Sequence, residues 1–233
     1  MNQKLSGALR ALVFVLAAFG GAAAGAQDVK GGDALAVLDA FVRQSRCGEA
    51  RFTQTVMSSP LATRGGPRIS KQDGRFAFCR AGQQFRFDYE PPFEQSIVAD
   101  GTTLWMHDKD LNQVTAQKQA QALAGSPTTV VTTARSIKDL ERDFELKAEE
   151  PQDSLRWVRA TPKSQDSTLS ILRVGLREGT KGQPPQLVML DIEDRFGKRS
   201  MLRFEDYTNR DRIDAARFAF TPPKGATVLK PEE

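Results

Sequence analysis

The sequence predicts a mainly β fold, in which an antiparallel sheet curls into a barrel or part of one. Between Gly74 and Thr115, large apolar side chains recur at every second position, as is typical of a sheet with one apolar and one solvated face. Turn signals separate these runs, namely Pro91-Pro92 and Asp100-Gly101. After residue 144, strand-like runs return at regular spacing with hairpin turns between them, which favours one curved antiparallel sheet.

The amino terminus has the features of a cleavable signal peptide, which we expect to span residues 1–26. Lys4 and Arg10 give a positive start, an apolar run follows, and Ala24-Gly25-Ala26 matches an A-x-A cleavage site. The apolar run is too short to span a bilayer comfortably. We therefore expect residues 27–233 to form a single exported domain.

Composition and charge argue against a nucleic-acid-binding protein. The chain has 33 Lys and Arg residues against 29 Asp and Glu residues, and Lys4 and Arg10 belong to the expected leader. The remaining basic residues are interspersed with acidic ones, so the basic stripe of a nucleic-acid interface is missing. A hydrophobic fraction of 39%, with 14 Phe residues, allows a substantial core.

The first elements follow from local signals. Asp33 is a plausible N-cap, and apolar residues at helical spacing after it predict a helix over Asp33–Gln44. Ala50–Met57 alternates as a first strand, and the loop-like segment Ser58–Gln72 joins it to the strands between Gly74 and Thr115. Later strands are expected at Phe144–Lys147, Leu155–Thr161, Thr168–Leu176, Gln186–Asp194, Ser200–Tyr207 and, as a last short strand, within Asp214–Pro223.

Three short helix-compatible segments interrupt the strands: Gln117–Leu123, Ser126–Thr133 and Ser136–Asp143. In the second, a Ser N-cap precedes Pro at the first helical position. Its β-branched residues weaken the helix propensity. A short, weakly helical insert between runs of strands has the composition of a lid. A surface connection without a function is an equally good interpretation of the pattern.

The search for catalytic motifs finds no G-x-S-x-G, no Gly-rich phosphate loop, no H-E-x-x-H and no C-x-x-C. His107 is the only histidine, and we interpret it as a solvent-exposed residue at a strand end. Carboxylates are plentiful but no pair stands out. We therefore expect no catalytic residue, no metal site and no cofactor.

Three side chains need a further explanation. Arg80 falls in step with Phe76 and Phe78, which places a cation on the apolar side of the sheet. Cys47 and Cys79 are the only cysteines, and in an exported chain such a pair favours a disulfide, with two buried free thiols as the alternative. A curved, aromatic-rich sheet with a lid and a lone cation suits a container for an apolar ligand better than a catalyst.

Four stretches carry a resemblance to a known family: ARFTQTV, GRFAFCRAGQQFRFDYEPPFEQSIVADGTTLWMHD, NQVT and DAARFAFTPPKGATV. Together they resemble LolA, the periplasmic lipoprotein carrier of Gram-negative bacteria, over the whole mature chain. The resemblance implies an unclosed antiparallel β-barrel covered by a lid of short helices. It also implies a periplasmic, non-enzymatic and monomeric carrier. Such a carrier takes acylated lipoproteins from an inner-membrane ABC transporter and passes them to an outer-membrane receptor.

The resemblance also implies roles for single residues. Arg80 matches the family's lid-gating arginine, although this chain has C-R-A where the family usually has K-R-P. Phe85 and Phe87 match its aromatic pair, with one extra residue before them. The pair Cys47 and Cys79 is not part of the common family pattern.

The expected acyl-chain surface comprises large apolar residues of the central strands. Ordinary core packing is the alternative for each of them. These residues are Phe76, Phe78, Phe85, Phe87 and Trp105, with Met106 and Met189 as further candidates. A carrier of another lipid or glycolipid on the same scaffold is the main alternative function, and a lipid esterase is a weaker one.

Overall fold

The computed structural model describes residues 32–59, 66, 68–123, 134–180 and 182–230. The expected signal peptide and the expected helix Ser126–Thr133 lie outside these residues. The described helices are α1 (Gly32–Gln44), α2 (Gln119–Ala122), α4 (Ile137–Asp143) and the 3-10 helix η1 (Ala215–Phe218). Among these helices, none is long and apolar enough to cross a membrane.

All described strands belong to one open sheet. The strands are β1 (Cys47–Met57), β2 (Ile69–Cys79), β3 (Gln84–Tyr89), β4 (Gln95–Ala99), β5 (Thr103–Asp108), β6 (Gln113–Lys118), β7 (Phe144–Gln152), β8 (Leu155–Pro162), β9 (Leu169–Arg177), β10 (Gln186–Asp194), β11 (Arg199–Arg210) and β12 (Thr227–Leu229). Their order in the sheet is β12-β6-β5-β4-β3-β2-β1-β11-β10-β9-β8-β7. All pairs are antiparallel except β12 with β6. The two ends of the sheet, β12 and β7, do not pair, so the predicted unclosed antiparallel barrel is confirmed.

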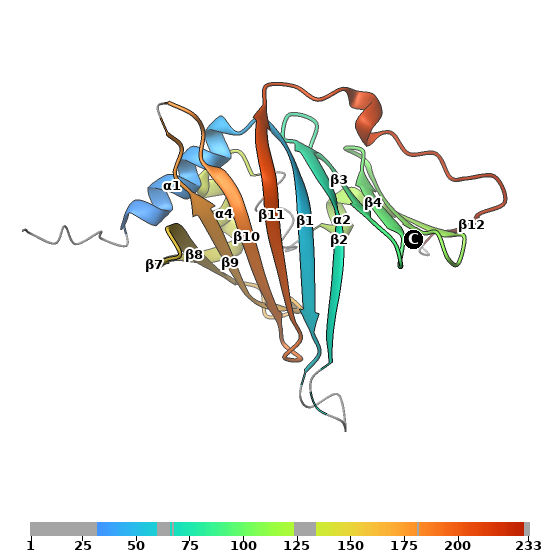
Figure 1. The fold of residues 1–233 in the computed structure, drawn as a ribbon, viewed down its shortest axis with the longest axis horizontal. Helices are drawn as coiled ribbons and strands as arrows, with labels where there is room; N and C mark the ends of the chain where they lie inside the picture. Colours follow the sequence, from blue (N-terminus) through green and yellow to red (C-terminus); the bar gives the residue numbers. More distant parts are fainter. Residues whose placement is uncertain (1–31, 60–65, 67, 124–133, 181, 231–233) are drawn as a thin grey trace, which may run out of the picture.

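Helices α1, α2 and α4 lie on one side of the curved sheet (Figure 1). Helix α1 packs against β7, β8 and β9, α4 packs against β7 and α1, and α2 packs against β5 and β6. The short helices predicted at Gln117–Leu123 and Ser136–Asp143 are therefore present as α2 and α4. We call the side of the sheet that faces these helices the inner face and the opposite side the outer face.

The core lies on the inner face. Residues that pair directly across antiparallel strands share a face, and Phe76 pairs with Phe87 while Phe78 pairs with Phe85. Phe41 of α1 packs against Phe78, with ring centroids 6.4 Å apart. The apolar residues predicted at alternate positions of β2 and β3 thus form one buried cluster with α1.

The last predicted strand, within Asp214–Pro223, is wrong. The chain forms η1 there, because the Asp214 side chain accepts a hydrogen bond from the amide of Ala216 and caps a turn. Residues 211–226, which we call the C-terminal strap, run over the outer face before β12 pairs with β6. Phe218 is buried against Cys47 and Cys79.

The position of His107 also differs from the prediction of an exposed strand end. His107 is only 7% exposed, and the centroid of its ring lies 5.8 Å from that of Phe220, a residue of the strap. The sequence of β5 alone carries no sign of this cover, because Phe220 is more than a hundred residues away along the chain.

Candidate functional site

Arg80 follows β2 directly and is fixed at both its backbone and its side chain. Its amide donates to the carbonyl oxygen of Arg46 at 2.9 Å. Its Nε donates to the carbonyl oxygen of Ser45 at 2.9 Å, and its Nη1 donates to that of Ala134 at 3.0 Å. One guanidinium therefore joins the end of α1 to the segment that leads into α4.

The surroundings of Arg80 are apolar. The residue is 6% exposed, and its Cζ lies 5.0 Å from the ring centroid of Phe41 and 5.1 Å from that of Phe78. Both distances are within the range of a cation–π interaction. Burial lowers the pKa of the guanidinium from 12.5 to about 10. In the described part of the chain, Nη2 finds no hydrogen-bond partner.

A disulfide bond stands beside this arginine. Cys47 and Cys79 are direct partners in the β1–β2 register, and the structure joins them covalently, with a Cα–Cα distance of 4.1 Å. Because Cys79 precedes Arg80 and Cys47 follows Arg46, the bond also holds together the two segments that the Arg80 amide links. The fold thus places the disulfide next to the hydrogen bonds of Arg80.

The structure brings four of the five residues of the expected acyl-chain surface together. The rings of Phe76 and Phe87 have centroids 4.5 Å apart, those of Phe76 and Phe78 lie at 5.7 Å, and those of Phe85 and Phe87 at 5.9 Å. All four side chains are buried in the core cluster. In this closed arrangement they pack against other residues of the chain and would meet a ligand only after the helices move.

Trp105 does not belong to this group, so its expected place on the acyl-chain surface is corrected. Leu104 joins the core cluster on the inner face, and strict alternation along β5 turns its neighbour Trp105 to the outer face. There its Nε1 donates to Asp100 Oδ2 at 2.9 Å, and its ring lies 5.5 Å from that of Phe220.

The two methionines also separate. Met106 pairs with Ile97, which pairs with Phe87, so Met106 lies on the inner face. Met189 packs instead against a small outer-face cluster and is not part of the expected surface.

Sequence reasoning missed several members of the inner aromatic cluster. Phe52 of β1 contacts Phe87 with centroids 5.5 Å apart, and Phe204 of β11 contacts Phe76 at 5.3 Å. Both occupy alternating apolar positions, which is the signal that could have found them. The carbonyl groups that bind Arg80 belong to the backbone, so the residue types at these positions do not predict them.

The described parts of the lid have defined attachments. Gln119 of α2 is buried, its Oε1 accepts from the amide of Gly101 at 2.9 Å, and its Nε2 donates to the carbonyl of Gln83 at 2.7 Å. At α4, the amide of Ile137 donates to Asp39 of α1 at 3.3 Å. The amide of Gln119 also donates to the carbonyl of Thr102 at 2.8 Å, and Lys163 donates to the carbonyl of Glu141 in α4, so hydrogen bonds attach both helices to the rest of the described chain.

The chemistry of the site is that of a covered apolar surface with one cation. Within the described residues, no group of three or more His, Cys, Asp or Glu side chains could hold a metal ion. The arrangement can hide or expose aromatic surface, and Arg80 is the buried charged group placed to link α1 and the segment before α4 to the end of β2.

Comparisons with known proteins agree with one another. The profile of the family described as "Outer membrane lipoprotein carrier protein LolA" matches residues 43–221. A relative named "Outer-membrane lipoprotein carrier protein" from Albidiferax ferrireducens is 41% identical over 200 residues, which cover 86% of this chain and 92% of the relative. A relative of the same name from Methylibium petroleiphilum is 40% identical over 84% of this chain and 89% of its own length.

Among solved structures, a LolA superfamily protein from Nitrosomonas europaea gives a TM-score of 0.43 at 14% identity, covering 82% of this chain and 98% of its own. The family match spans well over half of the chain, and the relatives are similar over nearly their full length. The chain therefore belongs to the LolA family.

Proposed function

We propose that the protein is a periplasmic, non-enzymatic carrier of lipoproteins bound for the outer membrane. The names of the relatives, each an outer-membrane lipoprotein carrier protein, support this proposal. In it, residues 1–26 direct export, and residues 27–233 act as one monomeric domain. The carrier receives acylated cargo from an inner-membrane ABC transporter and gives it to an outer-membrane receptor.

The observation that carries the mechanism is the pair of hydrogen bonds from Arg80 to Ser45 and Ala134. Ala134 lies just before α4, so the second bond ties the lid to the end of β2. We propose that Arg80 gates the lid: these bonds hold it closed when the carrier is empty, and they break when acyl chains enter. Among the described residues the buried Nη2 has no hydrogen-bond partner, and a closed state held by these residues alone is less favourable than a fully satisfied one would be.

Phe76, Phe78, Phe85 and Phe87 are the proposed acyl-chain surface. Hiding an acyl chain of ~16 carbons from water is favourable by on the order of 10 kcal/mol, at about 0.8 kcal/mol per methylene. Cargo with two or three chains would not cross an aqueous compartment alone. When the carrier is empty, the same aromatic rings must be covered, because a large exposed apolar patch promotes aggregation. A lid over an aromatic sheet meets both requirements.

Depletion of the protein from its own cells tests this function. The expected result is that lipoproteins of the outer membrane accumulate in the inner-membrane fraction, and that re-expression of the wild-type chain restores them. Unchanged fractionation in depleted cells would contradict the proposal.

Mass spectrometry of the material that co-purifies with the periplasmic protein identifies the cargo. Triacylated peptides are expected. A glycolipid or another lipid in their place would show that the scaffold serves a different cargo.

A further inference from the structure

We propose that one end of the sheet docks on an anionic lipid surface, through two neighbouring hairpin ends that carry exposed apolar and basic side chains. The first is the start of β2, and the second is the turn between β10 and β11. The residues of this surface, which we call the docking tip, are Arg68, Ile69, Lys71, Arg195, Phe196 and Lys198. It lies at the opposite end of β2 from Arg80 and plays no part in the proposed gate.

The two hairpin ends lie side by side. Met57, the last residue of β1, pairs with Ile69 of β2 on one side and with Arg199 of β11 on the other. A Cβ at Gly197 would lie 3.2 Å from the Oγ of Ser59, so the β10–β11 turn contacts the segment that follows β1. Figure 1 shows this turn beside the ends of β1 and β2 at the lower edge of the picture. The docking tip is therefore one surface on a framework of paired strands.

The apolar part of the tip belongs to a group of exposed residues at one end of the sheet. The four most exposed large hydrophobic residues of the described chain all lie in or beside turns at this end, and they are Ile69, Phe93, Leu111 and Phe196. Ile69 is 69% exposed and Phe196 is 74% exposed. The described turns at the other end of the strands carry no exposed large hydrophobic residue. Single exposed apolar residues are common on any surface, but where several gather they mark an interaction site.

Charge separates two of these four residues from the other two. The segments 68–71 and 194–199, around Ile69 and Phe196, contain five basic residues and one acidic residue. The segments 90–94 and 108–112, around Phe93 and Leu111, contain one basic residue and four acidic residues. An anionic surface is therefore attracted to the first pair of hairpin ends and repelled by the second pair.

The basic side chains of the docking tip are available to a partner. All four are exposed, and within the described part of the chain none of them forms an ion pair; they are Arg68, Lys71, Arg195 and Lys198. The acidic residue of the same segments, Asp194, accepts hydrogen bonds from the amides of Phe196 at 2.9 Å and Lys198 at 2.8 Å. Its carboxylate is thus directed at the backbone of the turn.

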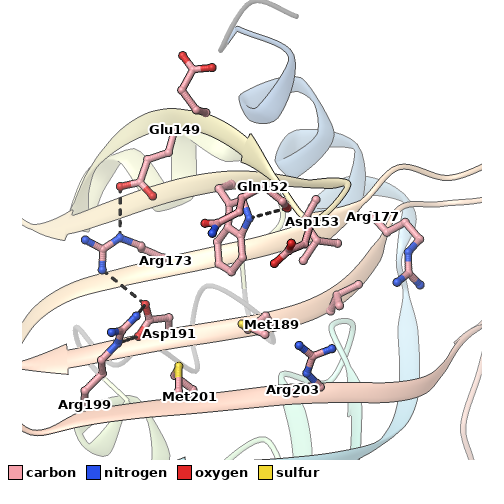
Figure 2. A pocket seen from close by; sticks show the side chains of 14 residues that line it. Glu149, Gln152, Asp153, Arg173, Arg177, Met189, Asp191, Arg199, Met201 and Arg203 are labelled. Atoms are coloured by element: carbon pink, nitrogen blue, oxygen red, sulfur yellow. Dashed lines mark hydrogen bonds and ion pairs between the residues drawn. The ribbon is translucent and has the colours of Figure 1, made fainter.

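Arg199, the fifth basic residue, is engaged elsewhere. It donates to Asp191 through Nε and Nη2, both at 2.7 Å, on the outer face (Figure 2). Glu193 is its direct partner across the β10–β11 pair. The next carboxylate along β2, Asp73, accepts a hydrogen bond from Thr53 at 2.6 Å. With Asp194 and Asp73 both counted against its four cations, the docking tip keeps a positive net charge.

The position of these side chains suits a lipid surface better than a protein partner. Proteins bury their anchoring side chains in matching pockets, whereas Ile69 and Phe196 stand on the ends of hairpins. A lipid surface needs no matching pocket, because apolar side chains enter the boundary between headgroups and acyl chains. The long side chains of Lys and Arg meanwhile reach the anionic headgroups. Docking by this end leaves Arg80, at the far end of β2, directed away from the lipid.

Flotation of the mature protein with lipid vesicles tests the docking tip. Vesicles of phosphatidylethanolamine and phosphatidylglycerol are the anionic probe, and vesicles of phosphatidylcholine are the neutral one. We expect the protein to float with the anionic vesicles at low ionic strength and to stay behind with the neutral ones. Added salt should release it, because salt screens the attraction between exposed charges.

A pair of double variants tests the apolar side chains. Ile69→Ser combined with Phe196→Ser should weaken binding to the anionic vesicles at least tenfold, because two apolar groups no longer leave water. Phe93→Ser combined with Leu111→Ser is the matched control, since these residues are similarly exposed at the same end of the sheet. The control should stay within about twofold of the wild type, because its hairpins are acidic. Both double variants should keep the wild-type unfolding temperature.

Charge reversal tests the basic side chains. Arg195→Glu combined with Lys198→Glu should weaken binding to the anionic vesicles at least tenfold, because each change replaces an attraction with a repulsion.

A fluorescent reporter locates the contact, because binding through the inner face would also float the protein. The Phe196→Trp variant should lose fluorescence on vesicles whose acyl chains carry bromine, beyond the loss seen for the wild type with Trp105 and Trp157. The Phe93→Trp variant should behave like the wild type.

Four results would overturn the proposal. They are a failure to float with anionic vesicles at low ionic strength, equal binding to neutral vesicles, an equal loss in the control variant, and quenching at Phe93→Trp in place of Phe196→Trp. If Phe196→Ser instead abolished a dimer seen in sedimentation, the docking tip would be an interface between two copies of the chain. The depletion experiment measures cargo delivery independently, so each of these results leaves the proposed carrier function standing.

Discussion

Arg80 shows how one side chain can join two segments that are distant in the sequence. It donates through Nε to Ser45 and through Nη1 to Ala134, two directions that only a fork-shaped cation offers at once. A lysine side chain ends in a single ammonium nitrogen, which lacks the fork and does not reach as far as Nη1 of arginine. We therefore expect Arg80→Lys to lose one of the two bonds and to open the lid in the empty protein. ANS fluorescence, which reports exposed apolar surface, should rise several-fold.

Arg80→Leu separates gating from stability. The pKa lowered to about 10 by burial means that keeping Arg80 charged costs roughly 3 kcal/mol at neutral pH, which offsets much of what its hydrogen bonds contribute. The free energy of unfolding, measured in urea, should therefore change by less than about 2 kcal/mol. ANS fluorescence of the empty protein should rise, and the release of cargo to the receptor should fail. Unchanged ANS fluorescence and normal release in this variant would refute the gate.

At this same scale, the sequence predicts the apolar environment of Arg80 but not its partners. Period two along β2 places Arg80 on the side of Phe76 and Phe78, and the Arg80 Cζ does lie over the Phe78 ring, with Phe41 of α1 as the second ring. Its acceptors are carbonyl groups, which every residue has. The prediction for Trp105 was wrong for a related reason. Alternation shows which residues share a face within one strand, but it does not show which of the two faces the helices cover.

At the scale of elements, the C-terminal strap is attached to the outer face by a small charge network. Arg217 lies 3.6 Å from Asp88, and its carbonyl accepts from Arg86 at 3.4 Å. Burial alone would raise the pKa of Asp88, but the hydrogen bonds from Arg86 and Ser96 and the charges of Arg86 and Arg217 hold it below its usual 3.8. The ionised carboxylate therefore stabilises the folded state at neutral pH.

The pH dependence of Asp88→Asn follows from the sign of that shift. A lowered pKa in the folded state gives a stabilisation that is present above pH ~4 and is lost as the pH falls through the folded-state value. Because the group is only about half buried, we expect the variant to lose about 1 kcal/mol at pH 7. Urea unfolding at pH 7 and pH 3 should show that the difference in the free energy of unfolding between the wild type and Asp88→Asn is smaller at pH 3. Asp110→Asn, in the exposed turn between β5 and β6, is the control. If this variant lost as much stability at pH 7, the effect would come from the change in net charge and not from the contacts of Asp88.

Most strands were predictable in this protein, but β12 and the strap that leads to it were not. The hairpins of β2 to β6 and of β8 to β11 combine alternation with turn residues such as Gly101 and Gly197, whose φ angles of 108° and 77° suit glycine. The strap also alternates, with Phe218 and Phe220, and so resembles a strand. These two rings serve instead as separate anchors, one against the disulfide and one against Trp105. Alternation records burial at every second position, whether or not a neighbouring strand pairs there.

At the scale of the whole molecule, the open sheet needs its aromatic inner face covered and its two halves held in register. The long strands β1 and β2 lie at the middle of the sheet order, so the bond between Cys47 and Cys79 acts at the centre of the fold. It closes a segment with a sequence separation of 32 residues. In the chain-entropy account, a loop of this length stabilises the folded state by about 3–4 kcal/mol.

We therefore expect the double variant Cys47→Ala, Cys79→Ala to fold with the same register but to unfold roughly 10 °C lower than the oxidised wild type, since 1 kcal/mol corresponds to about 2–4 °C at this size. Wild-type protein with reductant should match the variant, and reductant should not affect the variant itself. Because the same bond holds the segments joined by the Arg80 amide to Arg46, the variant should also bind more ANS when empty. If it unfolded at the wild-type temperature, the strand pairing and the buried Phe218 would be sufficient to hold the centre of the sheet without the covalent bond.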